Sequence, residues 1–481
     1  MSNRPDASRR AFLRLASLMS VAGSAGAPFA LNLATIGAAA AQTSSPDYRA
    51  IVCLFMNGGN DHANTVLATD PTSWNTYTTV RTTSEAGSIA LPGPSAAGGV
   101  LPIAPLTAQA GREFALHPQL GPLKDLFDAG RAAIVANVGP LLAPTTRAQY
   151  RAASVPLPPK LFSHNDQQST WQAGRPEGAS SGWGGRMGDL VAAANGNPIF
   201  TCISASGNAV FVSGQSVQQY QVSSAGAVAI GRLTGSLFGS SAAGNPLQAI
   251  VSGSRSHLFE KEHAAVVKRS IDAQAILASA MLPAGTGGVA NPTQYTNPNT
   301  GTPANNGLAT QLQTVARMVG ARGGLGARRQ VFFVSLGGFD THDNQRTAHA
   351  DLMARLAHAI SYFDSALATL PGGDMRSQVT LFTASDFGRT FTSNGDGTDH
   401  GWGAHHFVVG GAVKGRDLYG TFPVTGLGHE RDVGSGSLLP EISVDQYGAT
   451  LAAWFGLSDG QIADVFPNLG NFAARNLGFM R

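Results

Sequence analysis

Residues 50–59 read AIVCLFMNGG, seven consecutive apolar side chains followed by a polar turn with two glycines. A continuous apolar run of this length is typical of a strand buried on both faces, as in parallel sheets. The glycines permit a tight turn and let the backbone approach a ligand closely. The segment therefore predicts a central strand that leads into a functional loop.

Similar patterns recur along the chain. We predict further buried strands at 132–138, 330–336, 379–383 and 406–410, and helices at 117–128, 309–321 and 353–370. The last helix has one apolar stripe at spacings of three and four residues, formed by Met353, Leu356, Ile360, Phe363, Leu367 and Leu370. Strands that alternate with helices predict an α/β fold, with a largely parallel central sheet sandwiched by helices.

The domain organisation follows from composition. We expect a signal peptide at 1–41 and one α/β domain at 42–481 with loop-rich insertions. Residues 202–255 are rich in Ser, Gly, Val and Gln and are interpreted as a β-rich insertion. Residues 284–308, rich in Gly, Pro, Asn and Thr, are predicted to form a flexible loop.

The amino-terminal segment indicates export. Residues 8–14 read SRRAFLR and precede a run rich in Ala, Gly and Ser, with a small-residue cleavage site after Ala41. Paired arginines before an apolar stretch are typical of twin-arginine signal peptides. A retained membrane anchor is the alternative, but Gly, Pro and Asn interrupt the run. We therefore expect the twin-arginine translocase as an export partner, a periplasmic or secreted location, and no stable membrane span after cleavage.

Charge and cysteine content bear on nucleic-acid binding and on disulfide formation. The chain carries 32 basic and 29 acidic side chains, and loss of residues 1–41 removes four arginines and one aspartate, which leaves 28 of each. Without a basic run, nucleic-acid binding is not expected. Cys53 and Cys202 either pair in an oxidising compartment or remain buried thiols.

Acids and histidines lie next to predicted strands at four places, after the strand in three of them and before the strand at 406–410 in the fourth. The segments are 58–65 (GGNDHANT), 337–343 (GGFDTHD), 385–390 (SDFGRT) and 399–406 (DHGWGAHH). Each alone is most simply a turn or a helix cap. However, the carboxyl ends of parallel strands share one edge of a sheet, where such loops converge. Carboxylates gathered there would repel one another unless a cation lay between them, and mixed Asp and His donors suit Zn²⁺, Mn²⁺ or Fe.

Candidates for the chemical step lie in the same segments. Ser163 stands at a predicted helix start, where it is either a cap or a nucleophile activated by a metal. Thr65 is a rival nucleophile. Arg389 would hold an oxyanion, or alternatively form a structural ion pair. Of the adjacent His405 and His406, one is expected to face the site and the other the core.

The remaining histidines are given no role in the site. His117, which precedes Pro118, is interpreted as a helix-start residue. The others are predicted to lie on helix surfaces: His257, His263, His349 and His358.

These motifs together resemble the bacterial family known as domain of unknown function 1501. The resemblance covers nearly all of the chain after the leader. It rests on GGNDxxNT (58–65), LHP (116–118), SH (163–164), FDTH (339–342), DFGRT (386–390), DHG (399–401) and DQY (445–447).

That family is similar in fold to the alkaline phosphatase and sulfatase superfamily. The resemblance implies an alkaline-phosphatase-like sheet sandwich with a divalent metal centre, Zn or Mn, at the strand ends. It places Ser163 where the superfamily has its nucleophile. It implies metal ligands at Asp61, Asp340, His342, Asp386 and His400.

Three departures from the superfamily pattern are visible. Phe387 follows Asp386 where a histidine is common, Asp340 and His342 are two rather than four residues apart, and the sulfatase Cys/Ser-x-Pro-x-Arg motif is absent. One metal is therefore as well supported as two, and sulfate esters are less expected substrates than phosphate esters. The sequence predicts an exported metal-dependent hydrolase acting on a small-molecule or polymer ester. The alternative is a non-catalytic envelope binding or assembly protein with a reduced metal site.

Overall fold

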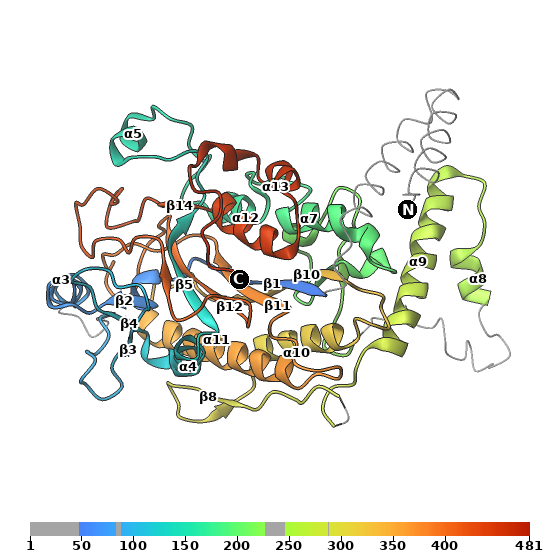
Figure 1. The fold of residues 1–481 in the computed structure, drawn as a ribbon, viewed down its shortest axis with the longest axis horizontal. Coiled ribbons are helices and arrows are strands. Elements are labelled where there is room, and N and C mark those ends of the chain that lie inside the picture. Colours follow the sequence, from blue (N-terminus) through green and yellow to red (C-terminus); the bar gives the residue numbers. More distant parts are fainter. Residues whose placement is uncertain (1–47, 83–87, 227–245, 287) are drawn as a thin grey trace, which may run out of the picture.

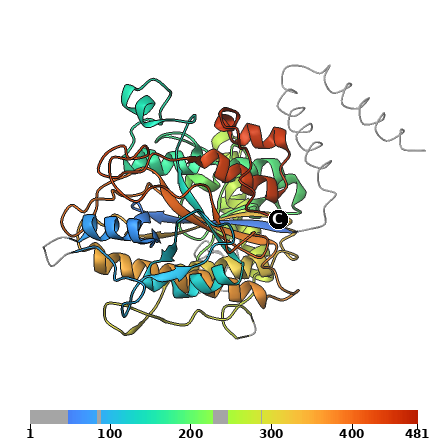
Figure 2. The same cartoon turned by 60° about the vertical axis from the view of Figure 1, so that its left-hand side comes forward.

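The computed structural model describes residues 48–82, 88–226, 246–286 and 288–481. The predicted signal peptide therefore lies outside the described residues. Within the described part of the chain, no helix is both long and apolar enough to span a membrane. The described chain forms a central sheet with helices on both faces (Figures 1 and 2).

The main sheet has nine strands in the order β13-β5-β12-β11-β1-β10-β6-β7, with β14 also paired to β5. Their bounds are β1 (Arg49–Asn57), β5 (Ala132–Gly139), β6 (Cys202–Ser204), β7 (Tyr220–Gln221), β10 (Arg329–Gly337), β11 (Val379–Ser385), β12 (Ala404–Val409), β13 (Leu418–Tyr419) and β14 (Ile442–Ser443). All described pairings are parallel except those of β12, which runs antiparallel to β11 and β5. The largely parallel sheet expected from the sequence is confirmed.

Smaller sheets lie outside this one. A three-stranded sheet is formed by β2 (Val66–Ala68), β3 (Leu101–Ile103) and β4 (Phe114–Leu116). A two-stranded hairpin is formed by β8 (Tyr295–Thr296) and β9 (Pro303–Ala304).

Helices cover both faces of the main sheet. Their bounds are α3 (Pro71–Arg81), α4 (Gly121–Asp128), α5 (Arg147–Ala152), α6 (His164–Ala173), α7 (Trp183–Val191), α8 (Pro246–Ser252), α9 (Leu258–Ala280), α10 (Gly307–Gly320), α11 (Gln345–Ala368), α12 (Val444–Phe455) and α13 (Asp459–Val465). One face of the sheet packs against α4, α10 and α11, and the other against α6, α7, α12 and α13 (Figure 1).

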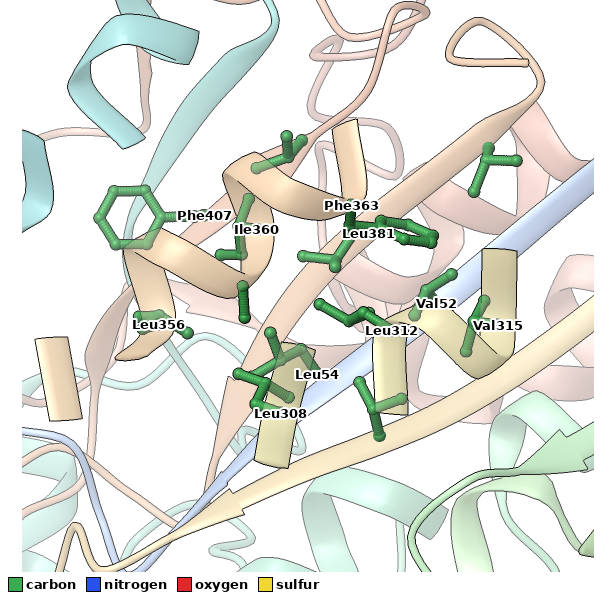
Figure 3. Close-up of a cluster of buried hydrophobic side chains, with 14 of the residues drawn as sticks. Val52, Leu54, Leu308, Leu312, Val315, Leu356, Ile360, Phe363, Leu381 and Phe407 are labelled. Carbon is green, nitrogen blue, oxygen red and sulfur yellow. The ribbon is translucent and has the colours of Figure 1, made fainter. Parts of the chain in front are cut away.

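Strand β1 shows how alternation builds the two cores. Val52 and Leu54 join the cluster under α10 and α11 (Figure 3), whereas Ile51 and Cys53 join the cluster under α7 and α12. Successive side chains of a strand point to opposite faces, so an unbroken apolar run is required where both faces are covered. Truncation of such a side chain, as in Leu54→Ala, costs about 2–5 kcal/mol.

The structure describes parts of the two expected insertions. The described part of 202–255 is not a separate β-rich unit, because β6 and β7 extend the main sheet and α8 is helical; residues 227–245 lie outside the described residues. Segment 284–308 contains the β8–β9 hairpin, which is tied to α11 by the Tyr295 hydroxyl on Asp351. The polar composition of the segment does not predict these contacts.

Candidate functional site

The site lies where three adjacent parallel strands end. β11, β1 and β10 are neighbours in this order, and their carboxyl ends lead into residues 386–390, 58–61 and 338–342. Because β12 runs antiparallel to β11, the loop before β12, which holds His400, reaches the same edge. Four segments far apart in the sequence are thereby brought together at the edge where α/β proteins bind ligands.

Asp340 occupies the centre of a cluster of imidazoles. Its Oδ1 lies 3.1 Å from Nε2 of His342 and 3.3 Å from Nε2 of His400, and its Oδ2 lies 3.4 Å from Nε2 of His164. Ligand atoms of His164, Asp340 and His400 all lie within 4.8 Å of one another. We call His164, Asp340, His342 and His400 the imidazole cluster.

The Nδ1 atom of each ring in the cluster forms a hydrogen bond with a protein oxygen. His164 Nδ1 lies 2.8 Å from Asp386 Oδ2, His342 Nδ1 lies 3.2 Å from Asp399 Oδ1, and His400 Nδ1 lies 2.8 Å from the Phe162 carbonyl. A carboxylate or a carbonyl only accepts hydrogen bonds, so each Nδ1 carries the proton. When a ring is neutral, its Nε2 then carries no proton and presents a lone pair.

The Nε2 atoms of His342 and His400 lie only 2.9 Å apart. Two lone pairs at this distance repel unless a proton or a cation lies between them. Burial lowers the pKa of His400, whereas the hydrogen bond from His164 to Asp386 raises the pKa of His164. Protonation of the cluster and binding of a cation are thus competing ways to satisfy the same lone pairs.

The spacing of the donors is close to the spacing of ligands around a bound metal ion. With metal–ligand bonds of about 2.0–2.2 Å, adjacent ligands of a tetrahedral zinc site are about 3.3 Å apart. The Nε2-to-carboxylate distances in the cluster are 3.1, 3.3 and 3.4 Å. The partners behind the rings match the outer groups that orient metal-binding histidines. His164, Asp340 and His400 therefore fit a divalent cation, with His342 beside them as a further donor.

The backbone at the end of β1 comes very close to the loop that holds Asp340. Gly58 has a φ of +115°, and a Cβ placed there would lie 2.3 Å from the amide nitrogen of Asp340. Its N–H donates to Asp386 Oδ1 at 3.1 Å. Glycine is thus required where β1 and the Asp340 loop touch.

Asp386 and Arg389 support the cluster from behind. Asp386 accepts from Gly58 and His164, so the structure places it behind His164 rather than among the innermost donors. Arg389 is buried and donates to Asp340 Oδ1 at 2.7 Å, to Gly58 O and to Thr398. Burial raises the pKa of Asp340, but the hydrogen bond and charge of Arg389 outweigh it and lower that pKa. These contacts match the structural ion pair, the alternative to an oxyanion-binding role.

The structure does not bring Asp61 to the cluster. Its carboxylate is buried, forms a bidentate ion pair with Arg81 at 2.5 and 3.0 Å, and accepts from Gln345 Nε2 at 2.5 Å. Burial alone raises the pKa of Asp61, but the charge and hydrogen bonds of Arg81 outweigh it and lower the pKa to about 2. This is the environment of a structural ion pair, and Arg81 could not be assigned as its partner from sequence spacing.

Of the two candidate nucleophiles, Ser163 lies next to the cluster. It precedes His164 at the start of α6, does not cap the helix with its side chain, and donates to the buried Asp166 Oδ2 at 3.0 Å. Thr65 is fully buried and donates to the Asp61 carbonyl at 2.8 Å. This bond ties Thr65 to the Asp61 loop.

Several other histidines and the cysteines occupy the interior. His405 and His406 are both buried, so the expectation that one faces the site is wrong: His405 accepts from Asn137 N, and His406 packs on Trp171. His349 is buried beside Asn60 rather than exposed on a helix surface. His117 starts a helix as expected, by accepting from Gln119 N. Cys53 and Cys202 are free and buried.

Sequence reasoning missed three groups of the site. His164 follows a loop rather than a predicted strand, so its position gives no signal of a site at the strand ends. Asp399 is exposed and precedes His400, and nothing in the sequence indicates that it contacts His342. The Phe162 carbonyl carries no side-chain signal, although Phe162 has a left-handed φ of 69° that turns its backbone.

Comparison with known proteins gives a family but little more. No curated protein matches the chain. Among solved structures, it is similar to Ps i-CgsB in complex with k-i-k-neocarrahexaose, at 9% identity and a TM-score of 0.35, over 88% of this chain and 77% of that one. It is also similar to a Bacteroides thetaiotaomicron protein from a core genetic locus for metabolism of multiple glycosaminoglycans, at 11% identity and a TM-score of 0.33, over 87% and 74% of the two chains.

Likeness at this level carries no information about the site. The family described as protein of unknown function (DUF1501) matches residues 48–443, a span that includes every residue of the imidazole cluster. The chain therefore belongs to the DUF1501 family.

Proposed function

We propose that this protein binds a divalent transition-metal ion through the imidazole cluster and uses it to hydrolyse phosphate esters. One observation carries the proposal: three imidazoles, each hydrogen-bonded through Nδ1, direct their Nε2 atoms toward the carboxylate of Asp340. Nitrogen-rich donor sets favour zinc over magnesium or calcium, with manganese as the second candidate.

In this proposal, some residues bind the metal ion and others position them. His164, Asp340 and His400 hold the ion, and His342 supplies a peripheral donor. Asp386, Asp399 and the Phe162 carbonyl fix the rings, and Arg389 fixes Asp340. A bound ion of this kind polarises an ester oxygen and lowers the pKa of a hydroxyl or water.

Two groups remain for the attack on the ester. Ser163 is adjacent to His164, and its hydroxyl already donates to Asp166, which is placed to accept the proton. A water molecule is the other nucleophile. Phosphate esters are the first expected substrates and sulfate esters the second, because the sulfatase maturation motif is absent.

Metal analysis combined with an ester screen tests the proposal. The full chain is purified after export without chelator, and its metal content and its hydrolysis of phosphomonoesters, phosphodiesters and sulfate esters are measured. Asp340→Ala and His400→Ala are compared with His263→Ala, a matched change at an exposed histidine of α9. We expect loss of metal and hydrolysis in the first two variants only. Equal behaviour of all three variants contradicts the proposal.

A second function has one observation in its favour. Arg389 is bonded on all sides by protein groups, so it is not available to hold an anionic ester. This is consistent with an envelope binding or assembly protein that keeps a metal for structure. Stoichiometric metal binding without hydrolysis of any ester in the screen favours this alternative.

Location is part of the proposal. The twin-arginine pattern at 8–14 supports export of the folded protein to the periplasm or beyond. Arg9→Lys with Arg10→Lys should retain the protein in the cytoplasm, and fractionation of cells followed by immunoblotting checks this. An unchanged distribution contradicts export by this route.

A further inference from the structure

A polar recess lies along helix α6, the helix that begins at His164 of the imidazole cluster. It has a volume of about 260 Å³, slightly below the usual range of about 300–1,000 Å³ for ligand pockets. Five amide side chains and three serine hydroxyls line it, together with Phe333 and two small apolar residues, and no charged side chain does. We call this recess the amide pocket.

Helix geometry connects the amide pocket to the cluster. His164, Gln168 and Gln172 are spaced four residues apart on α6, so they lie along one face of the helix. The first belongs to the imidazole cluster and the other two line the pocket. Asn57, which also lines the pocket, immediately precedes Gly58, whose N–H donates to Asp386.

Hydrogen bonds between protein groups orient the amide side chains of the pocket but leave some of their donors and acceptors available. Gln168 Nε2 donates to Asn57 Oδ1 at 2.7 Å, and Gln172 Oε1 accepts from Phe211 N at 3.1 Å. Among the described residues, these bonds leave an acceptor on Gln168 and donors on Asn57 and Gln172. Ser206 and Ser335, which also line the pocket, share one hydrogen bond of 2.5 Å.

This donor and acceptor pattern selects a class of ligand. A hydroxyl both donates and accepts, as do the amide side chains, whereas a carboxylate or phosphate needs cationic partners that the pocket lacks. An array of neutral hydroxyls on a compact ring satisfies several amides at once, and Phe333 offers an apolar surface. The geometry points to the neutral sugar ring of a substrate whose ester group lies at the imidazole cluster. This inference deepens the proposed hydrolase function and rests on it.

Two substrates with and without a sugar ring test the inference by activity. Glucose 1-phosphate and phenyl phosphate are compared in the wild type, Gln168→Leu and Gln274→Leu, the last being the same change on α9, away from the pocket. We expect Gln168→Leu to lower kcat/KM for the sugar ester about tenfold, as for the loss of one or two hydrogen bonds, and for phenyl phosphate less than twofold. Equal effects on both esters overturn the inference.

Sugar binding without catalysis keeps the test independent of the hydrolase proposal. Saturation-transfer NMR is recorded on metal-free protein with methyl glycosides of glucose, galactose, mannose and N-acetylglucosamine. We expect a signal from at least one glycoside that disappears in Gln168→Leu and weakens in Asn165→Ala, a milder change at the rim. Both variants should melt as the wild type does.

The two proposals fail in distinguishable ways. Sugar signals that depend on Gln168, in a protein without esterase activity, support the amide pocket and contradict the hydrolase. Hydrolysis of phenyl phosphate, with no glycoside signal and no preference for the sugar ester, supports the hydrolase and overturns the sugar site.

Discussion

The Nε2 atoms of His342 and His400 face each other at 2.9 Å, while the Nδ1 atom of each ring is bound by an acceptor. This contact is unfavourable between two neutral rings and becomes favourable when a cation joins them. A bound cation would remove this repulsion, which supports the metal site that we propose.

The carboxylate behind His164 should tune metal affinity. Asp386→Asn keeps an acceptor for the Gly58 N–H but removes the charge that orients His164. We expect metal affinity to fall about 10–100-fold, as for other outer groups of metal sites, while the melting temperature of the metal-free protein changes little. Competition with a fluorescent zinc chelator measures the affinity. Asp128→Asn, an exposed change on α4, is the control, and an equal affinity in both variants would argue against this role for Asp386.

The contact between β1 and the Asp340 loop should be intolerant of a side chain. In Gly58→Ala the new Cβ meets the Asp340 amide at 2.3 Å and the residue has a φ of +115°. We expect loss of metal binding and a destabilisation of about 1–3 kcal/mol from backbone strain. Gly98→Ala separates the two causes, because Gly98 has a φ of +66° with open space around it. A Gly58→Ala variant that binds metal normally contradicts the described packing.

The Asp61–Arg81 pair should matter for stability and not directly for chemistry. Arg81→Met leaves a buried carboxylate without its cation, which costs about 3–5 kcal/mol. The double change Asp61→Asn with Arg81→Met should recover much of that loss. Urea unfolding measures both variants, and Lys268→Met, in an exposed pair with Asp272, should cost less than about 1 kcal/mol. If Asp61→Asn alone abolishes metal binding in a stably folded protein, Asp61 is a ligand after all.

Buried histidines should make the metal-free protein sensitive to mild acid. Burial lowers the pKa of His62 and of His349 to about 4. Between the unfolded pKa of about 6.5 and the folded value, the unfolded chain binds more protons, so stability falls as the pH falls. Each such group contributes up to about 1.4 kcal/mol per pH unit.

Urea unfolding of the metal-free protein at several pH values checks this dependence. His349→Gln should reduce the slope below about pH 6.5 because it removes one of these groups. A stability that stays constant as the pH falls from about 6.5 to 5 would show that these rings are hydrated or already protonated.

The sequence predicts the frame of this molecule well, because its strongest signals are apolar runs and helical stripes. The run at 50–56 became β1, and the stripe from Met353 to Leu367 became the buried face of α11. The direction of β12 could not be predicted, since an apolar strand looks the same in either direction. That direction explains why His400 reaches the site although it precedes its strand.

The site was harder to predict, because an aspartate after a strand has the same signature whether it binds a metal, a ring or an arginine. Asp340 lies among the imidazoles and accepts from Arg389, Asp386 contacts the His164 ring, and Asp61 pairs with Arg81, so only their partners distinguish them. Those partners lie 49, 222 and 20 residues away in the chain. Local spacing contains no information about contacts of this length.

Metal stoichiometry of the exported protein tests the central claim most directly. Wild-type protein purified without chelator and dialysed against metal-free buffer should retain about one zinc or manganese per chain by mass spectrometry. Asp340→Ala and His400→Ala should retain almost none, while His263→Ala equals the wild type. A wild-type protein without a transition metal that also fails to take up added zinc or manganese would contradict the account.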